Sequence, residues 1–334
     1  MRYLNLKYTA VCPVCKHTGN RLLYKVSSHE AANHFLVTQG VSRNMLDVIN
    51  KKINTLWNKN NAAVVACNNC GFIFSDPFIA GDQEFYNLLP HANAGASEHW
   101  KWEFEKTYTE IEKIASSQKD IRLLEIGAST GDFVKRIKNI IPAENIFCLE
   151  HSEIGVDSIK KAGIEAHSWD FRKIKNKEGF SRRFDIVCLF QVLEHLDDID
   201  ETFDVINHVT RLGGHLFIGV PNEKKIMFNE LNDALLDMPP NHISRYNQRS
   251  FEILSQKYGW TVEEIAIEPY SVLEVMKTVM YYRSLKKLQF PVLKNTIAHR
   301  IKEYFQIKLM QLEAIFRHAE LGETRWVHLR KLNR

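Results

Sequence analysis

Short apolar runs alternate with segments of helical spacing over residues 120–270, and this alternation sets the expected fold. The first run, 122–126, enters a turn that contains Gly127 and Gly131, and apolar residues then recur at helical intervals. A helix capped by Asp197 or Asp198 is expected to end at Gly213-Gly214. Further strands are expected at 145–149, 164–168, 184–190, 216–220, 261–267 and 324–329. Strands that alternate with helices predict an α/β fold with a doubly wound, mostly parallel sheet.

The chain on either side of this alternation follows other patterns. Ser27 and Glu30 can form a capping box at the start of a helix, and the next helix is expected at 43–57. Residues 81–119 are rich in aromatic side chains and take helical spacing in their second half. A helical insertion at 271–319 separates the last two strands. We therefore expect three parts, which are a small unit at 1–80, a linker at 81–119 and the sheet domain at 120–334.

Four of the six cysteines form two pairs with the same spacing. Cys12 and Cys15 make one pair, and Cys67 and Cys70 make the other. Thiols two residues apart can bind one tetrahedral zinc ion, and two such pairs complete the site. Two disulfides or unrelated thiols are the alternatives, but a reducing compartment argues against the first and the matched spacing against the second. We expect a zinc-ribbon-like unit whose zinc is structural, because four thiolates leave no open position.

The overall composition is that of an ordinary globular protein, with 45% hydrophobic and 25% charged residues in a chain of 334. A net charge of +4 permits an anionic substrate but does not indicate a nucleic-acid partner, so none is expected. No apolar run approaches the roughly 18 residues of a membrane span. The first residues lack a signal-peptide core, so a cytoplasmic location is the expectation.

Acidic or amide side chains stand at or just after the ends of four predicted strands, namely Glu125, Glu150, Asp170 and Gln191. Doubly wound sheets bind ligands at the carboxyl ends of their strands. Glu150 follows the glycine turn at the distance where a carboxylate binds the two hydroxyls of a ribose. The turn at 127–131 lacks the G-x-G-x-x-G spacing of a dinucleotide site, and Glu125 would repel a phosphate but attract an amino group.

Three segments carry a resemblance to a known family. The sequence EIGASTG at 125–131 resembles the first motif of class I S-adenosylmethionine-dependent methyltransferases, although Ser129 stands where many members have glycine. The sequence QVLEHLDD at 191–198 resembles the segment after their fourth strand. The sequence PPNHISRY at 239–246 resembles a proline–histidine loop of a bacterial small-molecule branch. With the four cysteines, the chain is similar to bacterial zinc-ribbon methyltransferases, some of which modify nucleotide-linked sugars or other glycan precursors.

The resemblance implies a seven-stranded Rossmann-like methyltransferase sheet and methyl transfer to a small molecule, most simply a sugar, nucleotide-sugar or other glycan intermediate. It implies that Glu125 lies near the amino end of the cofactor, that Glu150 holds the ribose hydroxyls, and that Gln191 lies near the sulfonium. The residues that it assigns to S-adenosylmethionine are Glu125, Gly127, Ala128, Ser129, Gly131, Glu150, His151, Asp170, Phe171, Gln191 and Val192.

Methyl transfer to a hydroxyl or an acidic carbon requires a base. The catalytic candidates are His242, His195 and Glu194, and His242 in the proline–histidine loop is our first choice. His195 has a structural alternative as a local cap, and a divalent ion at Glu194 and His195 is a further alternative. Arg245 and Tyr246 are expected either to bind a phosphate or sugar or to hold the loop in place.

The insertion at 271–319 interleaves basic with apolar residues. We expect it to form a lid or a homodimer contact, with a solvated helix face and a membrane-surface patch as alternatives. Its basic residues include Arg283, Lys286, Lys287, Lys294, Arg300 and Lys302, and its apolar ones Phe290, Tyr304, Phe305 and Ile307. For the whole chain, two other functions stay open, an NAD-dependent oxidoreductase and a non-catalytic zinc-ribbon binding module.

Overall fold

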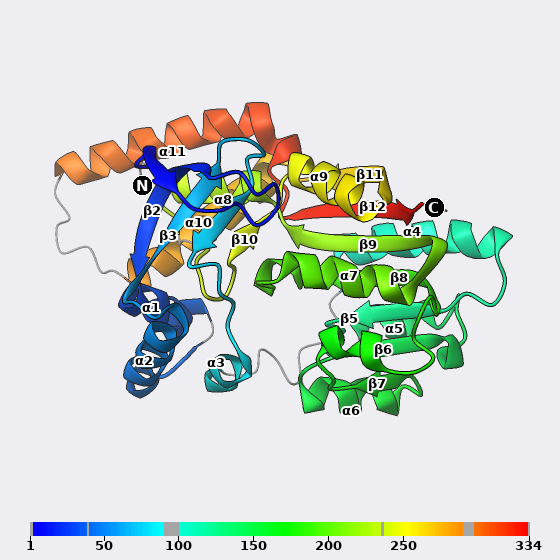
Figure 1. Cartoon of the computed structure of the whole chain (residues 1–334). Helices are drawn as coiled ribbons and strands as arrows, with labels where there is room; N and C mark the ends of the chain where they lie inside the picture. Colours follow the sequence, from blue (N-terminus) through cyan, green and yellow to red (C-terminus); the bar gives the residue numbers. More distant parts are fainter. Residues whose placement is uncertain (1–2, 39, 90–99, 235–236, 290–296, 333–334) are drawn as a thin grey trace. The chain divides into compact units, whose positions relative to one another are not determined.

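The computed structural model describes residues 3–38, 40–89, 100–234, 237–289 and 297–332 (Figure 1). The chain divides into two compact units. Residues 1–92, 221–247 and 267–323 form what we call the cysteine unit, and residues 93–220, 248–266 and 324–334 form the parallel-sheet unit. Each unit is therefore assembled from three separate segments. The three-part division after residues 80 and 119 stays a prediction.

The parallel-sheet unit is built on a seven-stranded sheet in the order β11-β12-β9-β8-β5-β6-β7. The pairs β5–β6, β6–β7, β5–β8 and β8–β9 are parallel. The chain adds β6 and β7 on one side of β5 and then returns to β8 on the other, so the topological switch point lies between β5 and β8. The expected doubly wound α/β sheet is thus confirmed. Its strands are β5 (Leu123–Ile126), β6 (Ile146–Leu149), β7 (Glu165–His167), β8 (Phe184–Phe190), β9 (Thr210–Pro221), β11 (Trp260–Ile267) and β12 (Thr324–Lys331).

Helices cover this sheet because its central strands are apolar on both faces. Every residue of β8 is buried, and Cys148 and Cys188 are fully enclosed in the core. The expected end of one helix was wrong: α7 stops at Val209 because Thr210 already pairs with Phe184 in the sheet. The helices are α4 (Trp102–Ser117), α5 (Asp132–Ile137), η2 (Ala143–Asn145), α6 (Glu153–Lys161), η3 (Phe171–Asn176), η4 (Leu193–His195), α7 (Ile199–Val209) and α9 (Gln248–Tyr258).

The cysteine unit contains a five-stranded antiparallel sheet in the order β1-β2-β3-β4-β10. Strands β1, β2 and β10 were not expected from the sequence. The expected capping box is confirmed. Ser27 N donates to Glu30 Oε2 at 2.8 Å, and Glu30 N donates to Ser27 Oγ at 3.2 Å. The strands are β1 (Leu6–Thr9), β2 (Gly19–Ser27), β3 (Asn61–Cys67), β4 (Ile73–Asp76) and β10 (Ser244–Arg245). The helices are α1 (Ser28–Thr38), η1 (Arg43–Met45), α2 (Leu46–Trp57), α3 (Gln83–Leu88), α8 (Glu223–Leu231), α10 (Val272–Gln289), α11 (Ile297–Arg317) and η5 (His318–Glu320).

The insertion forms the helices α10 and α11, and its basic character is weaker than the sequence indicated. Arg283 is buried and donates to the carbonyl oxygen of Asn232, so it is not on a solvated face. Lys286 pairs with Asp233, and Lys287 pairs with Glu303. Lys294 and Phe290 lie outside the described residues. None of the described helices combines the length and the apolarity that a membrane crossing requires.

Candidate functional site

The turn between β5 and α5 requires small residues at its two ends. Gly127 and Gly131 have φ values of 75° and 84°, in the left-handed region that favours glycine. A Cβ at Gly127 would collide with the side chain of Val192. A Cβ at Gly155 on α6 would collide with the carbonyl oxygen of Ser129. The loop after β8 and the start of α6 therefore pack directly on this turn, at the switch point of the sheet.

Glu125, in β5 directly before this turn, is a buried acid without a bonded partner at one of its oxygens. Its side chain is 3% exposed, and among the described residues no group donates a hydrogen bond to its Oε2. Burial raises the pKa of Glu125 to about 8, and the negative charge of Glu150 adds to the shift. A buried acceptor without a donor is costly, so a ligand amino group would be bound favourably at this position.

Glu150 follows β6 and holds the turn in place. Its Oε2 accepts from the backbone N–H of Ser129 at 2.7 Å, and its Oε1 accepts from the backbone N–H of Ser152 at 2.8 Å. Ser152 in turn caps α6 by accepting from Gly155 N. Each carboxylate oxygen of Glu150 retains a second lone pair, so a pair of ligand hydroxyls can still donate to it. His151, the next residue, is exposed.

Asp170 and Phe171 follow β7 and begin η3. Asp170 Oδ1 accepts from Arg172 at both the backbone N, at 3.1 Å, and Nε, at 3.0 Å. Burial would raise the pKa of Asp170, but these bonds and the charge of Arg172 outweigh burial and lower it. Phe171 is buried. Arg172 therefore holds the Asp170 carboxylate as an anion just after β7.

Gln191 and Val192 follow β8, and one partner of Gln191 was missed by the sequence analysis. Gln191 has a φ of 57°, and its Nε2 donates to Oε1 of Glu103 at 3.2 Å. Glu103 on α4 is 2% exposed, and its Oε2 accepts from Thr324 Oγ1 at 3.5 Å. The one sequence signal for Glu103 is a carboxylate in a helix face that otherwise buries Phe104 and other apolar groups. The structure brings all the predicted cofactor residues to the carboxyl ends of β5, β6, β7 and β8.

Glu194 and His195 lie in η4, in the same unit. Glu194 is buried and His195 is half-buried, so the adjacent side chains have different surroundings. The backbone N–H of His195 donates to the carbonyl oxygen of Val192 at 3.0 Å. This bond ties the loop of the base candidate to the residue that packs on Gly127. Their catalytic or metal-binding roles stay predictions.

His242 belongs to the cysteine unit, where a carboxylate that the sequence did not single out holds its ring. Oδ1 of Asp237 lies 2.7 Å from His242 Nδ1. Burial would raise the pKa of Asp237, but the charge of His242 and its hydrogen bond outweigh burial and lower the pKa to about 2. An anionic Asp237 fixes the proton of the neutral imidazole on Nδ1 and its lone pair on Nε2. Asp–His pairs of this kind orient a histidine for proton transfer.

Two neighbouring residues, Arg245 and Tyr246, are enclosed by contacts within the cysteine unit. Arg245 is buried, with NH1 and NH2 at 2.9 and 2.6 Å from the two carboxylate oxygens of the buried Glu230. Tyr24 also donates to Glu230, at 2.8 Å. Tyr246 is fully buried and packs edge-on against Phe72, with ring centroids 4.9 Å apart. These contacts favour the structural alternative for Arg245 and Tyr246 over phosphate or sugar binding.

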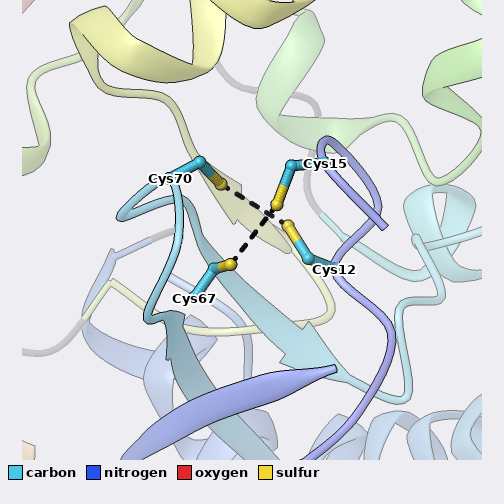
Figure 2. A group of neighbouring side chains, drawn as sticks. All are labelled: Cys12, Cys15, Cys67 and Cys70. Atoms are coloured by element: carbon cyan, nitrogen blue, oxygen red, sulfur yellow. Dashed lines mark hydrogen bonds between the residues drawn. The ribbon is translucent and has the colours of Figure 1, made fainter. Parts of the chain in front are cut away.

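The four paired cysteines meet at one point of the cysteine unit (Figure 2). Their sulfurs lie within 4.8 Å of one another, with Cys12 Sγ 3.7 Å from Cys70 Sγ and Cys15 Sγ 3.5 Å from Cys67 Sγ. Four thiolates at the Zn–S distance of about 2.3 Å would lie roughly 3.8 Å apart around a tetrahedral ion. The donor set and its spacing therefore fit zinc, and the disulfide alternative is wrong because all four thiols are free.

Both cysteine pairs sit in tight turns that expose the sulfurs to a common centre. Lys16 N donates to Cys12 O, and Gly71 N donates to Cys67 O, each at 2.9 Å. Gly71 has a φ of 72°, which glycine adopts without strain. Because the two turns have the same hydrogen bond, the equal spacing of the two cysteine pairs gives two similarly placed pairs of sulfur ligands.

Comparison with known proteins agrees with the parallel-sheet unit. A model of the family described as a methyltransferase domain matches residues 99–265, half of the chain. No relative was found among curated proteins. A solved S-adenosylmethionine-dependent methyltransferase from Archaeoglobus fulgidus is 16% identical, covers 68% of this chain and 94% of its own, and has a TM-score of 0.45.

A second solved structure, phosphoethanolamine N-methyltransferase 2 from Haemonchus contortus in complex with S-adenosyl-L-methionine, is 14% identical. It covers 68% of this chain and 53% of its own, with a TM-score of 0.43. At this level of similarity the two structures add no weight to the assignment. The family match spans the glycine turn, Glu125 in β5, Glu150 after β6, and the loop after β8. The chain belongs to the methyltransferase-domain family.

Proposed function

We propose that the chain transfers a methyl group from S-adenosylmethionine to a small-molecule acceptor, a sugar, nucleotide-sugar or other glycan intermediate. The observation that supports this choice of cofactor is the pair of acids, Glu125 and Glu150, on the two sides of the glycine turn. Glu125 offers a buried oxygen that lacks a donor within the described chain, and Glu150 offers free lone pairs beside the glycine turn. The first suits an amino group and the second a ribose diol.

When bound, S-adenosylmethionine supplies the methyl group on its sulfonium. The chain's part is to bind, orient and exclude water. Glu125 pairs with the amino group, and the tight turn at 127–131, with Ala128 and Ser129, allows a close backbone approach. Asp170 and Phe171 lie on either side of the adenine, and His151 lies beside the ribose. Gln191, fixed by Glu103, and Val192 form the floor of the site.

A histidine is our proposed base. His242 is the first choice because Asp237 fixes its ring and its tautomer, so that Nε2 can take the proton of a hydroxyl or an acidic carbon. His195 and Glu194 are the second choices, in the loop that follows the floor residues. If His242 acts, the Asn variant should lose about 10²–10⁴ in kcat, the usual contribution of a positioned base.

We also propose one structural zinc ion on Cys12, Cys15, Cys67 and Cys70. Reduced thiols at such a site fit a cytoplasmic location. The glycan-linked acceptor rests on the resemblance of residues 239–246 and of the four-cysteine unit to that branch. The oxidoreductase and non-catalytic alternatives draw no support from the family match.

Equilibrium binding of S-adenosylhomocysteine tests the proposal. The wild-type chain and Glu153→Gln, a variant of an exposed glutamate on α6, should bind it, and Glu150→Gln should bind at least about tenfold more weakly. NADH should not bind. Absence of S-adenosylhomocysteine binding to a folded wild-type chain would refute the function. A panel of nucleotide-sugars, assayed by methyl transfer from labelled S-adenosylmethionine, then tests the acceptor class.

A further inference from the structure

Helix α11 is apolar on two opposite faces, and one of them packs inside the cysteine unit. Met310 and Ala314 are buried in one core cluster with Val275 and Val279 of α10. A helix that is apolar on one stripe only is satisfied by such packing. The second apolar face of α11 does not pack against the described chain, so packing within the chain does not explain why it is apolar.

The second face consists of large apolar side chains that are each more than half exposed. Among the described residues of α11, these are Ile301 (52%), Tyr304 (58%), Phe305 (61%), Leu309 (68%), Leu312 (53%), Ile315 (53%) and Phe316 (79%). At roughly 200 Å² for a large side chain, they present on the order of 800 Å² of apolar surface. A standard interface buries about 800 Å² on each partner. The face is large enough for a stable interface and exceeds what monomers usually expose.

Four of these seven residues are placed symmetrically about a point just after the middle of the helix. Ile301, Phe305, Leu312 and Phe316 are placed so that a two-fold axis between Lys308 and Leu309 exchanges the first with the fourth and the second with the third. An antiparallel copy of α11 would therefore set Ile301 against Phe316 and Phe305 against Leu312. A surface that matches itself under a two-fold axis is the requirement for an isologous dimer.

One pair of opposite charges along the face suits a second copy, although exposed Arg300, Lys302 and Lys308 make its surroundings basic. Lys302 and Glu313 border the same side of the apolar stripe, since they are about three turns apart. In the antiparallel arrangement Lys302 of one copy comes within one turn of Glu313 of the other. A membrane-surface helix needs only basic residues beside its apolar face, so Glu313 is the group that favours a second copy. Glu313 is also held on the surface by Arg317 of its own chain.

We propose that α11 is the homodimer contact of this protein, formed by antiparallel pairing of its exposed face about the Lys308–Leu309 midpoint. The proposal is independent of the methyl acceptor and of the base. It replaces the lid as our explanation of the insertion. Since Lys308 lies over the ring of Tyr304, with Nζ 5.7 Å from the centroid, its charge need not interrupt the apolar contact.

Sedimentation velocity over a wide concentration range tests the proposal. The wild-type chain should be a dimer, and Leu309→Glu should raise the dimer dissociation constant at least ~30-fold, because the two-fold axis repeats the change. Leu273→Glu, at an equally exposed leucine of α10 (62%), is the matched control and should remain dimeric. Circular dichroism and unchanged S-adenosylhomocysteine binding would establish that the Leu309→Glu chain is folded.

Oxidative cross-linking of cysteine variants tests the register without relying on a destabilising change. An equimolar mixture of Ile301→Cys and Phe316→Cys should give a covalent dimer, whereas either variant alone should not. A monomeric wild-type chain, or cross-links between identical positions, overturns the proposal. So does binding of the monomer to vesicles of phosphatidylcholine and phosphatidylserine, or a Leu309→Glu variant that loses activity while it stays dimeric.

Discussion

Asp237 and His242 form a hydrogen-bonded pair, with Oδ1 of Asp237 2.7 Å from Nδ1 of His242. The pair is set in the cysteine unit by a loop in which Arg245 is anchored to Glu230. Because the carboxylate stays ionised with a pKa of about 2, it orients the ring across the whole pH range of an assay.

Replacement of Asp237 by Asn should lower kcat about 10–100-fold with little change in KM, because the ring loses its fixed tautomer. The acidic limb of the pH profile should also move to lower pH, since the anion that favours the charged ring is gone. The measurement is kcat and kcat/KM against pH for wild type, Asp237→Asn and His242→Asn, with the exposed His29→Asn as control. Unchanged profiles would mean that the pair is structural and would direct attention to His195.

Glu125 should make stability fall as the pH rises. Its folded-state pKa of about 8 lies above the unfolded value of about 4.3, so the folded chain binds one more proton between these pH values. Linkage then predicts a loss of at most about 1.4 kcal/mol per pH unit across this window. Urea unfolding at intervals from pH 5 to 8 should show the fall in wild type and not in Glu125→Gln. S-adenosylhomocysteine should bind more tightly as Glu125 ionises, and parallel curves for the two chains would contradict both statements.

His34 should have the opposite effect at lower pH. Burial lowers the pKa of this 7%-exposed histidine to about 4, so the unfolded chain, with a pKa of about 6.5, binds the extra proton. Stability should fall by ~3 kcal/mol as the pH drops from 6.5 to 4. His34→Leu should remove that part of the dependence, and His29→Leu, at an exposed position of the same helix, should not. A dependence shared by all three chains would assign it to other groups.

The four-cysteine cluster should bind about one zinc ion per chain, measured by elemental analysis of the purified protein. Cys67→Ser should abolish binding and loosen the cysteine unit, seen as faster hydrogen exchange in β3 and β4, because structural zinc binding is coupled to folding. Cys188→Ala removes a thiol from the core of the other unit and should keep the zinc. Zinc retained by the Cys67→Ser chain at wild-type affinity would exclude the proposed ligand set.

The sequence predicted features whose cause is local and periodic. The strands of the parallel sheet could be predicted from the sequence, because a strand buried on both faces is a continuous apolar run, as in β8. The cysteine cluster could be predicted because the two-residue spacing within each pair lets both thiols reach one metal ion. The roles proposed for Glu125, at the end of β5, and Glu150, after β6, follow from the rule that such sheets bind ligands at the carboxyl ends of their strands.

The features that the sequence did not predict depend on partners far away along the chain. β10 is two residues long and exists only through its pairing with β4, in which Ser244 faces Phe74. Glu103 belongs to the site only through its hydrogen bond with Gln191, which lies far away along the chain. The contact between Asp237 and His242 arises from a loop without periodicity. Apart from the acid at position 103 on a mostly apolar helix face and the proline–histidine motif around His242, no local pattern points to these contacts.

The position of β12 has a consequence for how the protein is made. This strand lies between β9 and β11 in the sheet, yet it follows both of them along the chain, after α10 and α11. A nascent chain that has emerged as far as β11 therefore holds two strands whose shared neighbour has not been synthesised. Their unpaired edges are open to other chains during that interval. Slow translation of the insertion would lengthen the exposure, so the yield of native protein should depend on chaperones that shield strand edges.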